Sequence, residues 1–298
     1  MISMTPTTNR LLLRHTVRRY RDELGLTQEE LGAKAFPDLR IAAARNKIAL
    51  LESAERVPRR LADFNAIIKA LKVTDPAVIE DMRHMHANSD VRGRWSGARA
   101  VFGEDIKQLV DLEHDAEQIR LTGSELVPGL LQCREYAQAL FTADDEHVSE
   151  RAVAASVDAR LSRAEVYLRA ERPVDFLVVL SVSCLLRIPS NATRDIMVRQ
   201  LEHLMHLAKR PNVVLQLVPF ETATLRQRIV EFQLLRIPAP GLAGPLDMAY
   251  TDVAFEARLI DDKDLVSSFE KAWTRWTASA LGPQDSRRFM EQLRLSFS

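Results

Sequence analysis

Residues Leu24–Gly32 read LGLTQEELG. Thr27 and Glu30 have the spacing of a capping box, in which the threonine hydroxyl accepts from a backbone N–H of the first turn while the glutamate reaches back to the cap. The pair therefore predicts a helix that starts at Thr27. Gly25 stands just before this start, where it predicts a tight turn.

An apolar pattern precedes the turn. Its members recur at spacings of three and four and so share one face of an earlier helix: Leu13, Val17, Tyr20 and Leu24. The other faces carry basic residues: Arg14, Arg18, Arg19 and Arg21. Two helices joined by a glycine-containing turn indicate a helix-turn-helix.

Three more helices are expected before residue 88. Phe36–Asp38 breaks the second helix, because the residue before a proline disfavours helix. A third helix is predicted over Leu39–Ser53, with an apolar stripe of Ile41, Ala44, Ile48 and Leu51. A fourth covers Leu61–Leu71, and Asp75 with Pro76 caps and opens a fifth.

The charge of the chain is divided unevenly. The 298 residues are 46% hydrophobic and 28% charged, with a net charge of zero. Residues 1–72 carry 14 Lys and Arg against 8 Asp and Glu, a net +6, which leaves −6 on the remainder. A basic part beside an acidic part is typical of a polyanion-binding module joined to a domain with another partner. A chance fluctuation of solvated surface charge is the alternative.

Composition also predicts where the protein works. No apolar run approaches the roughly 20 residues that cross a bilayer, and residues 1–10 lack the apolar stretch of a signal peptide. We therefore expect a cytoplasmic protein without membrane contact. Cys133 and Cys184 have no second cysteine or histidine at metal-ligand spacing, so neither a disulfide framework nor a zinc cluster is expected.

The sequence predicts an α+β fold with two domains. An all-α domain of about five helices covers 1–87, a linker anchored by Trp95 covers 88–103, and a C-terminal domain covers 104–298. This second domain is expected to be helical over 104–172 and mixed α and β, with a small sheet, over 173–298. Its strands are predicted from short β-branched runs at 174–180, 213–218 and 229–237, with weaker candidates at 247–253 and 255–260.

A helix that reads DNA must fit the major groove and carry long hydrogen-bond donors, with cations nearby for the phosphates. On the third helix and at its start, the donors are Arg40, Arg45, Asn46 and Lys47. Asn46 can read adenine, Arg45 can read guanine, and Gln28 can hold a phosphate or a base edge. The candidates for backbone contacts are Arg18, Arg56, Arg59 and Arg60.

These motifs resemble a known family. Leu24–Leu31 is similar to the λ-repressor-like helix-turn-helix of the xenobiotic-response-element family, and the remainder resembles its actinobacterial WhiJ-like subgroup, whose sensor-like domain has no assigned activity. The matching motifs are Leu112-Glu113, Val127–Gln132 with Tyr136-Ala137, Ala159–Leu161, Gln200-Leu201, Pro211–Val213 with Gln216–Pro219, and Ala280-Leu281. The resemblance implies a transcription regulator that is often encoded beside a small companion protein.

Three departures from that pattern stand out. The segment Phe36–Ala44 is longer than in these relatives, Ala54 stands where they commonly have glycine, and no glutamate occurs at 181–183. The first two bear on the geometry of base reading.

Little in the chain points to catalysis. Phosphate-loop, dinucleotide, nucleophile-elbow and paired-histidine metalloprotease motifs are all missing, so we expect neither an enzyme nor a cofactor. The pairs His203 with His206 and His84 with His86 each lack a third ligand for a metal. Trp273 and Trp276 are expected in the core, with a ligand cage as the alternative.

A polar group in the second domain is the candidate ligand or partner site: Glu113, Arg160 and Arg163, with Trp95 of the linker. Salt bridges between helices are the alternative role for these charges. The function expected from the whole sequence is a homodimeric regulator that binds double-stranded DNA, with a C-terminal domain that senses a small ligand or a partner protein. The alternative is an adaptor that acts with a small companion protein and does not read DNA.

Overall fold

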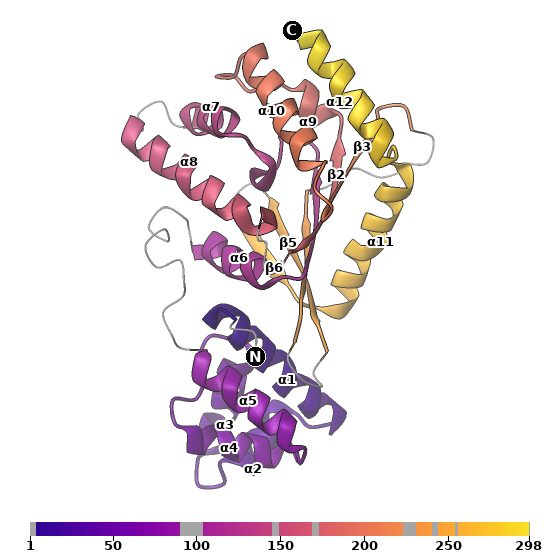
Figure 1. Ribbon diagram of the computed structural model, residues 1–298. Coiled ribbons are helices and arrows are strands. Elements are labelled where there is room, and N and C mark those ends of the chain that lie inside the picture. The colour runs from indigo at the N-terminus through magenta and orange to yellow at the C-terminus, as the bar shows by residue number, and fades with distance from the viewer. Residues whose placement is uncertain are drawn as a thin grey trace. The chain divides into compact units, whose positions relative to one another are not determined.

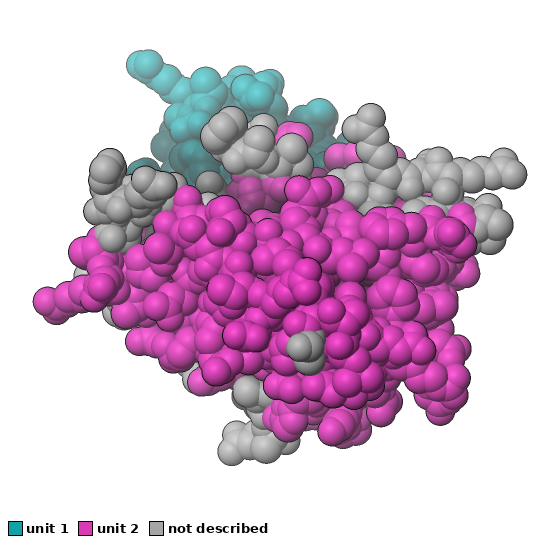
Figure 2. Space-filling view, turned by 90° about the horizontal axis from the view of Figure 1, so that it is seen from above, with its two compact units in different colours: residues 1–96, 237–246 teal, residues 97–236, 247–298 magenta. Residues whose placement is uncertain are grey.

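A computed structural model describes residues 4–89, 104–144, 149–168, 173–222, 231–239, 244–253 and 256–297. The chain divides into two compact units, residues 1–96 with 237–246 and residues 97–236 with 247–298 (Figure 2). The first contains helices and the second combines helices with a six-stranded sheet (Figure 1), which confirms the predicted α+β fold. None of the helices described is both long and apolar enough to span a membrane.

Five helices form the first unit, as predicted. They are α1 (Pro6–Glu23), α2 (Gln28–Ala35), α3 (Ile41–Glu52), α4 (Leu61–Ala70) and α5 (Pro76–Asn88). Their apolar faces meet in a core whose fully buried side chains include Leu13, Val17, Leu31, Ile48 and Phe64. The predicted caps are present, since Asp75 accepts from Ala77 N and Pro76 opens α5.

Gly25 follows the end of α1 and has a left-handed conformation, with φ of +63°. Its N–H donates to Asp22 O at 2.9 Å, and Leu26 N donates to Arg21 O at 3.0 Å. These two bonds form a Schellman motif, which satisfies the last carbonyls of a helix and turns the chain sharply. The turn places Thr27 directly before Gln28, the first residue of α2.

The second unit contains seven α-helices in its described part. They are α6 (Glu104–Asp115), α7 (Arg134–Asp144), α8 (Glu150–Ala164), α9 (Ser183–Leu186), α10 (Arg194–Leu207), α11 (Lys263–Ser279) and α12 (Pro283–Phe297), with short 3₁₀ turns η2 (Gly129–Leu131) and η3 (Glu165–Leu168). The long helix α8 ends at Ala164, and the 3₁₀ turn η3 follows it directly. Ser149 caps α8 as its side chain accepts from Ala152 N, and Ala164 is its last α-helical residue.

The sheet has the strand order β3-β2-β1-β4-β5-β6. Its strands are β1 (Gln118–Gly123), β2 (Asp175–Ser181), β3 (Val213–Val218), β4 (Gln233–Ile237), β5 (Leu246–Val253) and β6 (Glu256–Ile260). β1, β2 and β3 are parallel, with α10 connecting β2 to β3, whereas β4 is antiparallel to β1 and β6 is antiparallel to β5. The predicted strand runs 174–180 and 213–218 are present as β2 and β3, and together with α10 they form a strand, helix and strand unit.

The prediction that residues 104–172 are wholly helical is wrong, because β1 lies within this range. Ala116 and Ile119 continue the apolar spacing of α6, which favours helix locally. The strand forms because Gln118–Gly123 pairs with β2 on one side and β4 on the other. Distant partners satisfy its polar side chains, since Arg120 donates to Glu270 and Thr122 exchanges hydrogen bonds with the Phe232 backbone.

Helices cover both faces of the sheet. In Figure 1, α6, α7 and α8 lie on one side and α11 on the other. Trp273 and Trp276 of α11 pack in a core cluster with Val179, Leu234 and Ala249 of the strands. The tryptophans therefore have the core role expected for them.

Candidate functional site

The capping box at the start of α2 is present. Thr27 Oγ1 accepts from Glu30 N at 3.2 Å, and Glu30 Oε2 accepts from Thr27 N at 2.8 Å. The Glu30 carboxylate accepts hydrogen bonds from both the N–H and the hydroxyl of Thr27, and these bonds hold the pKa of this carboxyl below its usual value. The start of α2 is therefore fixed by its own side chains.

Gly32 lets α2 and α3 approach closely. A Cβ at this position would lie 2.7 Å from Ala44 C and 2.8 Å from both Ala44 O and Arg45 N. All three atoms belong to the backbone of α3, so no side-chain rotation can relieve the clash. The orientation of α3 against α2 thus depends on the absence of a side chain at Gly32.

Glu52 joins three segments of the helix-turn-helix. Its carboxylate accepts from Arg21 Nε at 2.6 Å, Arg21 Nη2 at 3.0 Å and Gln28 Nε2 at 2.8 Å. Arg21 also donates to Leu26 O in the turn. The Glu52 side chain is only 4% exposed and that of Arg21 13%. This network links the end of α1, the start of α2 and the end of α3.

The nine predicted DNA contacts fall into two groups. The exposed residues are Arg18, Arg40, Arg45, Asn46, Arg56, Arg59 and Arg60. Gln28 and Lys47 have partners inside the unit. Gln28 donates to Glu52, while Lys47 Nζ lies 2.8 Å from Asp63 Oδ2 and 4.6 Å from the centre of the Phe36 ring. Either residue would therefore have to contact DNA beside its present carboxylate partner or in place of it.

The first turn of α3 exposes apolar groups. Ile41 is 59% exposed, and Ala42 and Ala43 are exposed beside it. Beyond them, Arg45 and Asn46 are the polar residues on the exposed face. Leu39 and Leu61 add exposed apolar surface at 40% and 49%.

A groove of about 810 Å³ lies between the α2–α3 connection, α3 and the start of α4. Its basic and amide wall contains five of the predicted DNA contacts: Asn46, Lys47, Arg56, Arg59 and Arg60. Asp38 and Asp63 also line it, and Phe36, Leu50 and Val57 contribute apolar surface. The structure thus brings more than half of the predicted contacts to one groove of the first unit.

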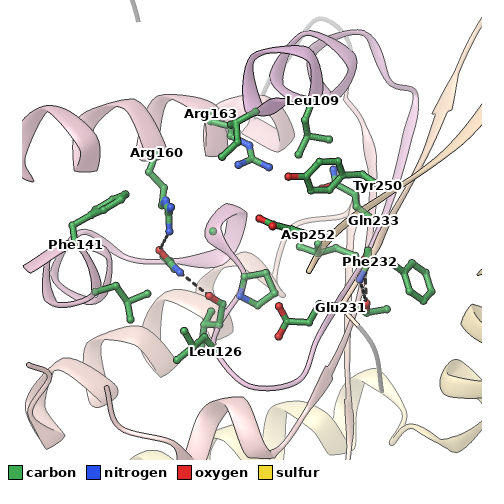
Figure 3. Close-up of a pocket in the computed structure, with 18 residues that line it drawn as sticks. Leu109, Leu126, Phe141, Arg160, Arg163, Glu231, Phe232, Gln233, Tyr250 and Asp252 are labelled. Atoms are coloured by element: carbon green, nitrogen blue, oxygen red, sulfur yellow. Dashed lines mark hydrogen bonds between the residues drawn. The ribbon is translucent and has the colours of Figure 1, made fainter. Parts of the chain in front are cut away.

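A cavity of about 340 Å³ lies in the second unit, over the face of the sheet that α6, α7 and α8 cover (Figure 3). Strand residues on its wall include Leu121 of β1, Gln233 of β4 and Tyr250 of β5. The Val127–Gln132 motif contributes its loop, and α8 contributes Arg160 and Arg163. Two of the predicted ligand-site residues therefore line a real cavity.

Arg163 is held in place from behind by Glu113. The guanidinium donates from Nε to Glu113 Oε2 at 2.6 Å and from Nη2 to Oε1 at 2.7 Å, and Gln233 Nε2 donates to the same Oε1 at 2.8 Å. Burial lowers the pKa of Arg163, but the charge and hydrogen bonds of Glu113 outweigh it and raise this pKa. Glu113 is 1% exposed and does not line the cavity. The pair therefore combines the two expected roles, a salt bridge between helices and part of the cavity wall.

Arg160 is held by the Val127–Gln132 motif and α7. Its Nη1 donates to Gln132 Oε1 at 2.8 Å, and its guanidinium lies 4.4 Å from the centre of the Phe141 ring. Gln132 Nε2 donates in turn to Val127 O at 2.7 Å. Tyr136 completes the motif as its hydroxyl accepts from Val127 N, and burial raises the pKa of this tyrosine to about 12.

The acidic wall of the cavity was not predicted from the sequence. Glu231 Oε1 accepts from Ser124 N at 3.0 Å, from Ser124 Oγ at 3.3 Å and from Glu125 N at 3.1 Å. Asp252 of β5 and Tyr250 also line the cavity. In Figure 3 the Glu231 and Asp252 carboxylates and the Tyr250 hydroxyl point into it. The one local signal was the carboxylate of Asp252 near the end of β5.

The other candidates do not form a site. Among the described residues, no three His, Cys, Asp or Glu side chains are grouped to hold a metal. His86 lies 2.6 Å from Pro58 O and stacks on Phe64, while burial lowers the pKa of His203. Trp95 and most of the predicted linker, residues 90–103, lie outside the described residues.

A family model described as a domain of unknown function (DUF5753) matches residues 106–292. The chain belongs to the DUF5753 family. The match runs from α6 into α12, so every residue that lines the cavity falls within the DUF5753 region. No curated protein and no solved structure matches the chain.

Proposed function

We propose that this DUF5753 protein is a cytoplasmic transcription regulator whose first unit binds double-stranded DNA through α3. The observation that carries the proposal is the fixed geometry of α2 and α3. The capping box, the close contact at Gly32 and the Glu52 network hold α3 with Arg45 and Asn46 exposed. The resemblance to xenobiotic-response-element and WhiJ-like regulators supports the same function.

The exposed face of α3 offers the chemistry of a major-groove reader. Arg45 can donate two hydrogen bonds to guanine, and Asn46 can pair with adenine. The apolar first turn suits contact with thymine methyl groups, which alanine and other small apolar side chains make. The exposed arginines around α3 would bind phosphates: Arg18, Arg40, Arg56, Arg59 and Arg60.

Gln28 and Lys47 have a different proposed role. Because each already contacts a carboxylate, we propose that they position α3, Gln28 through Glu52 and Lys47 through Asp63. Phosphate contacts from either residue remain a prediction, in which the DNA would bind beside the present carboxylate partner or replace it.

We further propose that the protein acts as a homodimer and that the DUF5753 region senses a small ligand or a partner protein rather than catalysing a reaction. One short recognition helix contacts few base pairs, and two half-sites restore specificity. The cavity supports a sensing role because it offers a bounded site with convergent polar groups. Light scattering that shows a monomer both free and on DNA would contradict the dimer.

One observation favours a second candidate function. Leu39, Ile41 and Leu61 expose apolar surface at the start of α3 and α4, which suits a protein partner as well as DNA. The second candidate is an adaptor that binds a small companion protein through this surface.

Retention of duplex DNA decides between the two functions. The purified protein is mixed at low salt with fragments of the DNA upstream of its own gene, and separately with any small protein encoded next to it. A regulator retains a fragment. Failure to retain any fragment, together with co-purification of the neighbouring protein, replaces the regulator with the adaptor.

A further inference from the structure

The cavity of the DUF5753 region has walls of opposite charge. Arg160 and Arg163 project from α8, whereas Glu231 precedes β4 and Asp252 lies on β5. Glu113 pairs with Arg163 from behind, and Asp252 on the sheet side lies near enough to Arg163 to interact with it electrostatically. The charges that a ligand meets at the wall therefore include Arg160 on the helical side and two carboxylates on the sheet side.

The acidic side is prepared for a cation. Three donors from Ser124 and Glu125 fix one oxygen of Glu231, so the carboxylate is oriented before any ligand arrives. Figure 3 shows the Asp252 carboxylate pointing into the same cavity, with the Tyr250 hydroxyl near it. An ammonium group offers three donors that can be shared between such acceptors.

The basic side is prepared for an anion. Gln132 and the Phe141 ring are among the groups that orient the Arg160 guanidinium. A planar guanidinium in a fixed orientation binds a carboxylate through two parallel hydrogen bonds.

Apolar residues lie between the charged groups. Leu109, Leu126, Pro128 and Phe141 line the cavity and can cover the body of a ligand. The volume of about 340 Å³ stands at the lower end of the range for small-molecule sites. The size suits a small molecule, and the two carboxylates oppose a ligand that carries negative charge alone.

We propose that this cavity binds a small zwitterion of the amino-acid or dipeptide class that has an apolar side chain. Its ammonium group contacts Glu231 and Asp252, and its carboxylate contacts Arg160. The assignment gives a chemical class to the effector and so rests on the sensing role proposed above. Binding itself requires only the DUF5753 region and no DNA.

Calorimetric titration of the full chain tests the class of ligand. The probes are leucine, phenylalanine and the dipeptides that combine them, each compared with its N-acetyl and C-terminal amide derivatives. At least one zwitterion is expected to bind, and both of its blocked forms are expected to bind roughly tenfold or more weakly, because each loses a charge-assisted contact. Absence of binding by every zwitterion, or equal binding of the blocked forms, would overturn the proposal.

Variants of the wall test the place of binding. Asp252→Asn and Arg160→Gln are each expected to lower the affinity for the best probe roughly tenfold or more. Matched controls are Asp175→Asn at the start of β2 and Arg151→Gln on α8, both exposed and outside the cavity. Leu126→Trp fills the cavity from a position that is 37% exposed, so it tests the site without removing a charge.

Loss of binding in the wall variants and in Leu126→Trp, with unchanged controls, supports the site. Binding that survives Asp252→Asn, Arg160→Gln and Leu126→Trp contradicts it. DNA retention is measured on the same samples. A probe that binds to a protein without DNA affinity leaves the cavity assignment standing and refutes only the regulator.

Discussion

The carboxylate of Glu52 and the guanidinium of Arg21 form a nearly buried pair, with N–O distances of 2.6 and 3.0 Å, between the last residue of α3 and the last turn of α1. Gln28 adds a third donor from the first residue of α2. The orientation of the proposed recognition helix therefore depends on one carboxylate that receives donors from two other helices.

Replacement of Glu52 by glutamine should destabilise the first unit strongly. The amide keeps the size of the side chain but leaves only the exposed Asp22 carboxylate, 2.8 Å away, to balance the Arg21 charge, whereas the loss of a partner costs about 3–5 kcal/mol in fully buried pairs. Hydrogen exchange of the amides in α1, α2 and α3, followed by mass spectrometry, reports the loss of stability of this unit alone. The control Glu55→Gln, at an exposed position, should change exchange little, and equal effects of the two variants would refute the role of the pair.

Gly32→Ala should force α2 and α3 apart. Its Cβ would lie 2.7 Å from the Ala44 backbone, and overpacking of this kind costs about 1–3 kcal/mol. Thermal unfolding followed by circular dichroism gives the change in stability. Gly282→Ala is the matched control, since no atom lies within 4 Å of its added Cβ. A Gly32→Ala protein as stable as this control would show that the close contact is not required.

Ala54→Gly should stabilise the first unit. Ala54 follows the end of α3 with φ of +59°, a conformation that costs a residue with a Cβ roughly 1–2 kcal/mol. Glycine adopts this conformation freely, so a gain of about 1 kcal/mol is expected. The control Ala155→Gly, within α8, should instead lower the stability of the protein by about 0.5–1 kcal/mol. If denaturant unfolding shows that both changes destabilise the protein, the strain assigned to Ala54 does not exist.

The buried thiols should make stability decline in alkali. Burial raises the pKa of Cys133 to about 11 and that of Cys184 to about 12, from a usual value of 9.0. Above about pH 9 the unfolded chain loses these protons first, so stability falls as the pH rises toward the folded pKa values, by about 1.4 kcal/mol per pH unit for each thiol. Below that pH the thiols contribute no slope.

Urea unfolding at about pH 7 and about pH 10 checks the sign of this effect. The double variant Cys133→Ala with Cys184→Ala should lose less stability between the two conditions than the wild type. An identical loss in both proteins would show that other groups cause the alkaline decline.

Local signals predicted the helix-turn-helix well. The capping box spans the four residues Thr27–Glu30, the Schellman turn lies next to it, and the apolar spacing recurs within the helices. The third helix was predicted to begin at Leu39 and begins at Ile41, because Arg40 precedes it without a side-chain cap that would mark the start in the sequence.

The sheet and the cavity depend on distant partners, which a single sequence does not reveal. β1 carries a weak local pattern and forms because β2 and β4 pair with it. Gln28 and Lys47 were predicted as DNA contacts, and their bonds to Glu52 and Asp63 in other segments could not be predicted from local spacing. The cavity wall joins Arg160 to strand residues near positions 231 and 252, and no motif links these segments in the sequence.

The central claim is that α3 binds duplex DNA, and the affinity of exposed α3 variants tests it most directly. Fluorescence anisotropy with a retained upstream fragment gives the Kd at several salt concentrations. If α3 binds duplex DNA, log K falls steeply and linearly with log salt, and Arg45→Ala and Asn46→Ala each weaken the affinity roughly tenfold or more. Arg287→Ala removes an exposed charge from α12 and should leave the affinity nearly unchanged. Absence of binding at low salt, or α3 variants that bind as tightly as Arg287→Ala, would contradict the account.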